Sequence, residues 1–169
     1  MLGKFFTPLI WLSAILLFGL AIAAPASASQ ATPKSGKYRI QSASTGLFID
    51  ALDSNQADGT PVVVAPLNNP TTANQEWTLD INSGNIGTLQ SISSFVRILS
   101  GPNPDQLVTK LGTKEQGFFT LVESSSGVFV CATPSSFGCL TSPTEPGSTI
   151  VLEPFTGARN QTWNFQTVG

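Results

Sequence analysis

Three stretches of the sequence share one form, in which a glutamine precedes by two positions an aromatic residue that opens an alternating run: Gln75-Glu76-Trp77-Thr78-Leu79, Gln116-Gly117-Phe118-Phe119-Thr120 and Gln161-Thr162-Trp163-Asn164-Phe165. The glutamines recur with a period of roughly 40–45 residues, which is typical of a repeated supersecondary unit. A short strand that opens on an aromatic residue suits a pleated surface with one buried face. The sequence therefore predicts three copies of one structural unit.

The first and third units also align upstream of these motifs. Residues 46–50 match residues 127–131, and residues 59–64 match residues 147–152, as glycine followed by an apolar run. This alignment places Cys131 where the first unit has Asp50.

The rest of the chain from Gly36 onward consists of short apolar runs broken by Gly, Pro, Asn and Ser. The runs are rich in β-branched and aromatic residues, and none has sustained helical periodicity, which indicates an all-β fold. Three units are too few for a typical propeller of about four to eight blades. We expect a β-trefoil of three pseudo-symmetric four-strand repeats, with Trp77, Phe118 and Trp163 converging on one core.

The chain begins with a segment that is typical of a secretory signal peptide. Lys4 precedes a largely apolar run, and Ala26, Ser27 and Ala28 provide small residues for cleavage. The predicted organisation is a signal peptide over residues 1–28, a linker over 29–35, and a β-trefoil domain over 36–169 with repeats at about 36–80, 81–123 and 124–169. The protein would then be secreted and extracellular, without a membrane contact after cleavage. The alternative is a retained membrane anchor.

The amino-acid composition limits the kinds of catalytic, metal-binding and nucleic-acid-binding site that we expect in this chain. The sequence has no histidine, so the usual general base and zinc ligand are absent, and we expect no catalytic residue, metal or cofactor. Ten carboxylates against eight basic residues make the chain mildly acidic, which argues against a nucleic-acid partner. The two cysteines, Cys131 and Cys139, are predicted to form a disulfide in a secreted chain. Two free thiols are the alternative.

Taken together, the motifs resemble those of the ricin-B-type, or R-type, lectins, whose β-trefoil carries a Gln-x-Trp motif in each repeat. The resemblance is densest in the first repeat, and it implies a carbohydrate site there with Asp50, Asn74 and Gln75 as hydrogen-bonding residues. Asp50 also has a plainer interpretation as a solvated turn former. In the family an aromatic ring on the third strand stacks on the sugar, but Ala65 stands at that position.

The other two repeats depart further from the family pattern. In repeat three, Asn160 precedes the motif glutamine as the family requires, whereas Glu153 stands at the ring position. Phe155 is either a substitute platform for the sugar or a core residue. Asn160 also begins an N-glycosylation sequon. Repeat two has Arg97 or Ile98 in the Asp region and Glu115 in place of the Asn, so we expect it to be structural only.

The motif residues have a second, structural role in this interpretation. We expect the amides of Gln75, Gln116 and Gln161 to be buried and to bond backbone groups in the turns, since buried polar groups need partners. The set predicted to build the scaffold is Gln75, Trp77, Gln116, Phe118, Gln161 and Trp163.

The resemblance implies a carbohydrate-binding protein with glycans or glycoproteins as partners. The alternative is a protease inhibitor or defence protein that acts through a protruding loop, with residues 100–105 and 141–147 as the candidate loops. An enzyme that uses the carboxylates of Asp50, Asp53 and Asp58 is a third hypothesis. These three acids lie in a Gly- and Asn-containing stretch, which is more typical of a solvated turn.

Overall fold

The computed structural model describes residues 31–91, 94–98, 106–111, 117–133 and 138–169. The predicted signal peptide, Gln116 and the candidate loop at residues 100–105 lie outside these ranges. Within them, no helix is both long enough and apolar enough to cross a membrane.

In the described part of the chain, twelve strands follow one another in three groups of four. The first group is β1 (Gly36–Ser42), β2 (Phe48–Ala51), β3 (Val62–Ala65) and β4 (Trp77–Ile81). The second is β5 (Ile86–Ser91), β6 (Ser94–Ile98), β7 (Leu107–Leu111) and β8 (Phe119–Ser124). The third is β9 (Gly127–Ala132), β10 (Cys139–Thr141), β11 (Val151–Glu153) and β12 (Thr162–Thr167). Among the described residues, single-turn 3-10 segments lie between strands at η1 (Leu52–Ser54), η2 (Ala73–Gln75) and η4 (Arg159–Gln161).

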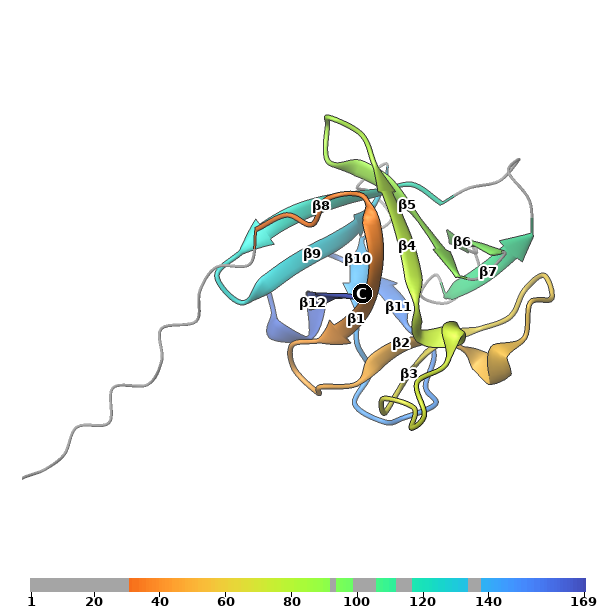
Figure 1. Ribbon diagram of the computed structural model, residues 1–169. Coiled ribbons are helices and arrows are strands. Elements are labelled where there is room, and N and C mark those ends of the chain that lie inside the picture. The colour runs from red at the N-terminus through yellow and green to blue at the C-terminus, as the bar shows by residue number, and fades with distance from the viewer. Residues whose placement is uncertain (1–30, 92–93, 99–105, 112–116, 134–137) are drawn as a thin grey trace, which may run out of the picture.

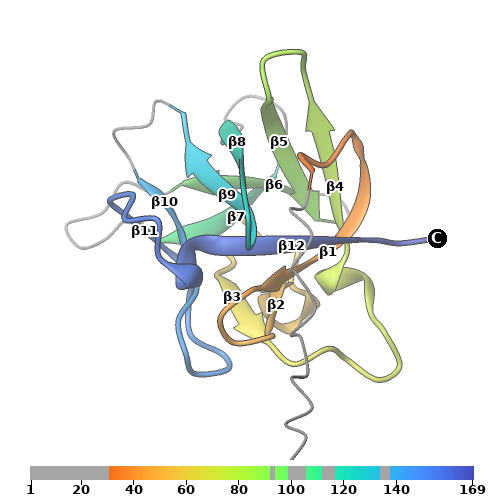
Figure 2. The same ribbon diagram turned by 90° about the vertical axis from the view of Figure 1, so that its left-hand side faces the viewer.

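Six of the strands close into a barrel, in the cyclic order β1-β4-β5-β8-β9-β12, and every pairing is antiparallel. Closure leaves no free edge in this part of the sheet. The remaining strands form the hairpins β2–β3, β6–β7 and β10–β11. In Figure 1 the β2–β3 hairpin lies at the bottom and the β6–β7 hairpin at the right, and Figure 2 shows the same arrangement from the side.

The three hairpins are joined to one another in a cycle. Isolated bridges pair Pro61 with Val108, Gln106 with Val151, and Thr149 with Val63. Each bridge joins the start of one third strand to the third strand of another repeat, which is what an approximate threefold axis requires. The β-trefoil prediction is confirmed.

The core lies where the barrel strands turn one face inward, and its largest side chains come from equivalent positions. Trp77 pairs with Ser91, Phe119 with Ala132 and Trp163 with Ser42, and all three rings are at most 1 % exposed. The indole nitrogens of Trp77 and Trp163 donate to the carbonyl oxygens of Ile49 and Leu140, at 3.0 and 3.1 Å. Each of the two indole rings therefore also satisfies its polar atom inside the core.

The prediction for Phe118 is wrong by one residue. Phe118 precedes β8 and is 49 % exposed, whereas Phe119 occupies the position equivalent to Trp77 and Trp163. Because successive side chains in a strand point to opposite faces, a shift of one residue exchanges the core for the surface. The Phe118-Phe119 doublet offered two aromatic residues, and the Gln-x-aromatic spacing selected the wrong one.

The strand registers also correct the alignment of repeats one and three. Strand β9 is the first strand of its repeat and is equivalent to β1, so Cys131 is not the counterpart of Asp50. Asp50 pairs with Val63 and Thr141 pairs with Val151, which makes Thr141 the equivalent residue. Two strands that both follow a glycine and alternate apolar residues cannot be told apart by pattern alone.

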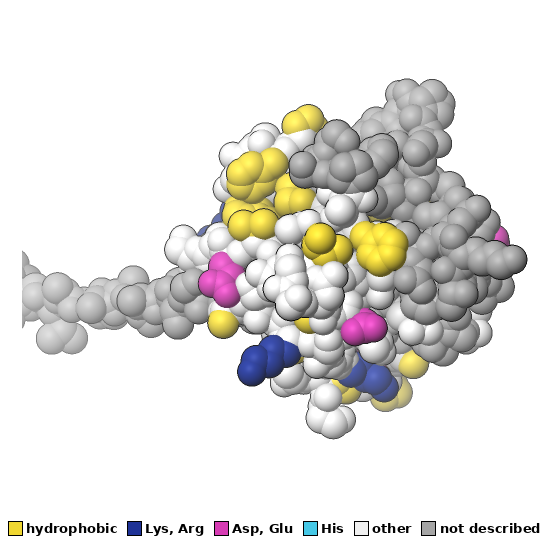
Figure 3. All heavy atoms as spheres, turned by 90° about the horizontal axis from the view of Figure 1, so that it is seen from above, with side chains coloured by type: hydrophobic (Ala, Val, Ile, Leu, Met, Phe, Trp, Pro, Cys, Tyr) yellow, Lys and Arg dark blue, Asp and Glu magenta, His cyan; other side chains and the backbone are white. Residues whose placement is uncertain are grey.

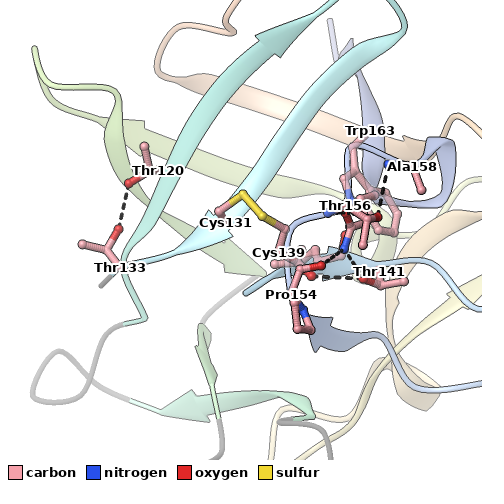
Figure 4. The surroundings of a disulfide bond; sticks show 11 residues. Thr120, Cys131, Thr133, Cys139, Thr141, Pro154, Thr156, Ala158 and Trp163 are labelled. Carbon is pink, nitrogen blue, oxygen red and sulfur yellow. Dashed lines mark hydrogen bonds between the residues drawn. A yellow bond between two sulfur atoms is a disulfide. The ribbon is translucent and has the colours of Figure 1, made fainter. Parts of the chain in front are cut away.

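The predicted disulfide between Cys131 and Cys139 is confirmed. It joins β9 to the first residue of β10, where the two cysteines are also paired in the sheet (Figure 4). Phe129 clusters with the two cysteines. Its ring packs edge-to-face against that of Phe155, with the ring centroids 4.9 Å apart. The disulfide therefore links the first strand of repeat three, β9, to the second strand, β10.

Replacing both Cys131 and Cys139 by alanine should lower the free energy of unfolding by about 2–3 kcal/mol, because the bond closes a loop with a sequence separation of 8 residues. Denaturant titrations of the wild-type protein, with and without reductant, and of the double variant measure this loss. Reductant should destabilise only the wild-type protein. Equal stability of the wild-type protein and the double variant in the absence of reductant would contradict the expectation.

Candidate functional site

The candidate site begins with Asp50, near the end of β2. Only 5 % of Asp50 is exposed, and both oxygens of its carboxylate accept hydrogen bonds. Asn74 Nδ2 donates to Oδ1 at 2.7 Å, and Gln75 Nε2 donates to Oδ2 at 2.9 Å. The interpretation of Asp50 as a solvated turn former is therefore wrong. It is a buried carboxylate held by two amides.

The two amides come from η2, the short turn before β4, and Gln75 ties that turn to the β3 exit. Its Nε2 also donates to the carbonyl of Pro66 at 2.8 Å, while its Oε1 accepts from the backbone N–H of Asn68 at 2.9 Å. Gln75 is fully buried. The side chain thus satisfies two backbone groups of the loop and orients the carboxylate of Asp50 at the same time.

The charge of Asp50 is set by opposing effects. Burial, which disfavours the ionised form, raises the pKa of this carboxyl above its usual value, and the hydrogen bonds from Asn74 and Gln75 counteract part of that rise. The neighbouring carboxylate of Asp53 raises the pKa further. Asp50 therefore titrates at a higher pH than an ordinary aspartate.

A pocket of about 420 Å³ opens beside Asp50. Its polar lining combines two carboxylates with amide and hydroxyl side chains, and its apolar lining consists of small or medium-sized side chains. The lining residues are Asp50, Leu52, Asp53, Ser54, Val63, Ala65, Asn68, Thr72, Asn74 and Gly147. Ala65 lies in this pocket, so the position where the family has a stacking ring is occupied by a methyl group.

One acceptor in this lining has no partner. Asn74 is 5 % exposed and directs its amide nitrogen to Asp50 and, at 3.4 Å, to the carbonyl of Ala51. Its Oδ1 is buried without a hydrogen bond. An unsatisfied buried acceptor costs about 1–3 kcal/mol, so a ligand that donates a hydrogen bond here would recover part of that free energy. Hydroxyl and ammonium groups are such donors.

Repeat three has the same framework without the carboxylate. Thr141 takes the place of Asp50, and its Oγ1 accepts from Gln161 Nε2 at 3.2 Å. Gln161 also donates to the carbonyl of Pro154 and accepts from the backbone N–H of Thr156, as Gln75 does with its own loop (Figure 4). The shared bonding shows that a glutamine amide anchors both turns. A neutral hydroxyl replaces the charged acceptor in this repeat.

The remaining side chains proposed for repeat three are dispersed. Asn160 is partly exposed, and its backbone carbonyl oxygen accepts a hydrogen bond from the backbone N–H of Ser142. Glu153 is exposed at the ring position. Phe155 is 60 % exposed, so its interpretation as a core residue is wrong. Glycosylation of Asn160 stays a prediction; the sequon threonine, Thr162, is fully buried and donates to Arg159.

In repeat two, the register places Arg97 opposite Val108, as Asp50 is placed opposite Val63. The Asp-equivalent position in this repeat thus has a residue of opposite charge. Glu115 lies outside the described residues.

Sequence reasoning missed part of the pocket. Asn68 and Thr72 lie on the β3–η2 loop, which carries no motif, and Gly147 comes from repeat three. Asp53 was predicted as a solvated turn residue or as part of an enzyme, yet it lines the pocket with Asp50, while Asp58 does not. Among the described residues, no three His, Cys, Asp or Glu side chains are grouped so that they could hold a metal ion.

Few charged side chains are visible among the described residues on the face shown in Figure 3. On the face shown in Figure 3, the described Lys and Arg side chains stand apart from one another, whereas hydrophobic side chains gather in a group. Of the second candidate loop, residues 141–147, Thr141 and Ser142 are buried and the N–H of Gly147 donates to Val64. The two ends of this loop are therefore held against the fold.

Known proteins place this geometry in context. Residues 27–99 match the family model described as a ricin-type beta-trefoil lectin domain-like. No curated protein matches the chain.

Solved structures share the fold at low sequence identity. The Rhizoctonia solani agglutinin is 21 % identical, with a TM-score of 0.72 over 82 % of this chain and 99 % of that one. The Macrolepiota procera ricin B-like lectin in complex with lactose is 20 % identical, with a TM-score of 0.64 over 82 % and 100 %. The designed threefold-symmetric protein ThreeFoil is 19 % identical, with a TM-score of 0.69 over 79 % and 99 %. These findings confirm the resemblance to the ricin-type β-trefoil lectins, whose family model matches residues 27–99, including the whole of repeat one, and whose fold the described chain has.

Proposed function

We propose that this chain is a secreted, non-enzymatic carbohydrate-binding protein whose site is the pocket of repeat one. The observation that carries the proposal is the buried carboxylate of Asp50, which two amides hold at the wall of an open pocket. Vicinal hydroxyls of a sugar are hydrogen-bond donors that match such an acceptor, and hydrogen bonds to a charged group are worth about 1.5–3 kcal/mol.

The comparisons support the same class of ligand. A family model of lectin-like domains matches the repeat that contains the pocket, and the similar Macrolepiota procera lectin is described in complex with lactose. Glycans, free or on glycoproteins, are therefore the proposed partners. The lack of a ring at Ala65 shifts the expected recognition from stacking toward hydrogen bonding.

The test is a glycan array probed with the mature protein. The proposal predicts binding to a defined subset of glycans, and a soluble form of the same glycan should compete for it. If the folded protein bound no glycan on the array, the proposal would be overturned.

Binding should weaken as the pH is lowered through the raised pKa of Asp50, because protonation removes the charged acceptor. The affinity loss should begin at a higher pH than the usual carboxyl range would give. Isothermal titration with the best glycan of the array, at a series of pH values, measures it. An affinity independent of pH across the whole carboxyl range would contradict the role of Asp50.

The pH dependence of folding stability distinguishes this loss of binding from unfolding. Since the folded state raises the pKa of Asp50, its ionisation destabilises the fold, and that penalty is relieved as the pH falls through the raised pKa. Protonation of Asp50 thus removes binding without itself promoting unfolding. Denaturant titrations at the same pH values provide the control.

A further inference from the structure

The carboxylate of Asp53 gives the repeat-one pocket a second negative charge. Asp53 lies in η1, with a left-handed backbone conformation (φ 56°) that Ser54 shares (φ 55°). Aspartate is among the few non-glycine residues that adopt this region readily. The turn keeps Asp53 at the pocket, near enough to Asp50 for the two carboxylates to repel each other.

The pocket lining contains no positive charge to balance the two carboxylates. None of its ten residues is a lysine or arginine. In the described part of the chain, Lys37 and Arg39 both form ion pairs with Glu76, which does not line the pocket. The pocket therefore favours a ligand that brings a positive charge, and repels an anionic one.

A separate observation indicates that the ligand donates hydrogen bonds to the pocket. Asn74 is 95 % buried and lines the pocket, and its amide nitrogen donates to Asp50 and Ala51. Its Oδ1 has no hydrogen-bond partner among the described residues. Asp50, Asp53 and Asn74 thus offer acceptors. An ammonium group has three donors and one positive charge, and it matches this set better than a hydroxyl does.

We infer that the pocket prefers sugars that carry a free amino group, with Asp53 as the residue that determines this preference. The inference rests on the proposed carbohydrate binding and specifies its ligand class. The ammonium group would lie between the carboxylates of Asp50 and Asp53, and the sugar hydroxyls would use the remaining acceptors. An N-acetylated sugar has no such charge and would lose the advantage.

The experiment compares methyl glycosides that differ only at carbon 2, as the hydroxyl, amino and acetamido forms in both the gluco and galacto series. In slightly acidic buffer of low ionic strength, the amino form should bind about fivefold more tightly than the hydroxyl form of the same series. The advantage should shrink in about 0.5 M salt, where charges are screened.

The matched variants are Asp53→Asn and Asp58→Asn. Asparagine tolerates the left-handed conformation, so Asp53→Asn removes the charge and keeps the turn. It should abolish the advantage of the amino sugar, so that the amino and hydroxyl forms of one series bind this variant with similar affinity. Asp58→Asn makes the same change on the same loop, outside the pocket lining, and should retain the advantage.

The outcomes separate the two proposals. If neutral sugars bind and amino sugars bind no better, the inference is overturned and carbohydrate binding stands. If neither class binds, both fail. If the advantage survives Asp53→Asn, or disappears when divalent cations are chelated, an ammonium group between these carboxylates is not its source and the inference is overturned.

Discussion

Asp50→Ala should reduce glycan affinity at least about tenfold, because it removes the only charged group that is both buried and part of the pocket lining. The change also leaves Asn74 Nδ2 and Gln75 Nε2 without their shared acceptor, which costs stability, while relief of the buried charge offsets part of that cost. Asp50→Asn keeps the shape of the side chain and removes the charge, but it also replaces one of the two acceptor oxygens by an amide donor that faces the donor of Asn74 or Gln75. Isothermal titration on both variants measures the loss.

Thr141→Ala is the matched control for this prediction. It removes the acceptor of Gln161 at the equivalent position of repeat three, so it perturbs the same scaffold. Glycan affinity should be retained, and denaturant titration should show only a modest loss of stability. If Asp50→Ala and Thr141→Ala reduced affinity equally, the effect would come from the fold and the assignment of the site would be wrong.

Trp163→Ala and Phe119→Ala should each lower the free energy of unfolding by about 3–5 kcal/mol, because both side chains are at most 1 % exposed and their removal leaves cavities in the core. Phe118→Ala should cost less than about 1 kcal/mol, since about half of that residue is exposed. Denaturant titrations of the three variants measure these values. A larger loss for Phe118→Ala than for Phe119→Ala would restore the alignment that the structure rejects.

The fold could be predicted because each repeat carries its signal locally. The glutamine motif before Trp77 and Trp163 marks a buried turn and the first inward ring of a strand, and both glutamines bond their loops in the same way. These two signals, with a third in repeat two that is displaced by one residue, indicate three copies of one unit in a closed structure. The disulfide was also accessible to sequence reasoning, because the two cysteines of the sequence allow one pairing.

The details of alignment needed the sheet registers. The Phe118-Phe119 doublet satisfies an alternating pattern in either phase, and the phase decides which ring is buried. The residues before Cys131 and those before Asp50 both form short apolar strands, although one belongs to the first strand of a repeat and the other to the second. Pattern alone carries no information on strand order within the repeat.

The sequence predicted the central residues of the candidate site but few of the other residues that line the pocket. Asp50, Asn74 and Gln75 are brought together as the resemblance implied, through contacts between β2 and η2. Asp53 was not assigned to the carbohydrate site, because an acid in a turn has an ordinary explanation and because its place in the pocket depends on two left-handed residues. Gly147 reaches the pocket from another repeat, a contact that no local pattern encodes.

The most direct measurement is a titration of the isotope-labelled protein with its best array glycan, followed by amide chemical shifts. The largest changes should fall on Asp50, Asp53, Ala65 and Asn74, with little change at Thr141 and Asn160. Saturating shifts centred on Thr141 and Asn160, with the repeat-one amides unmoved, would place the site in repeat three and contradict the account.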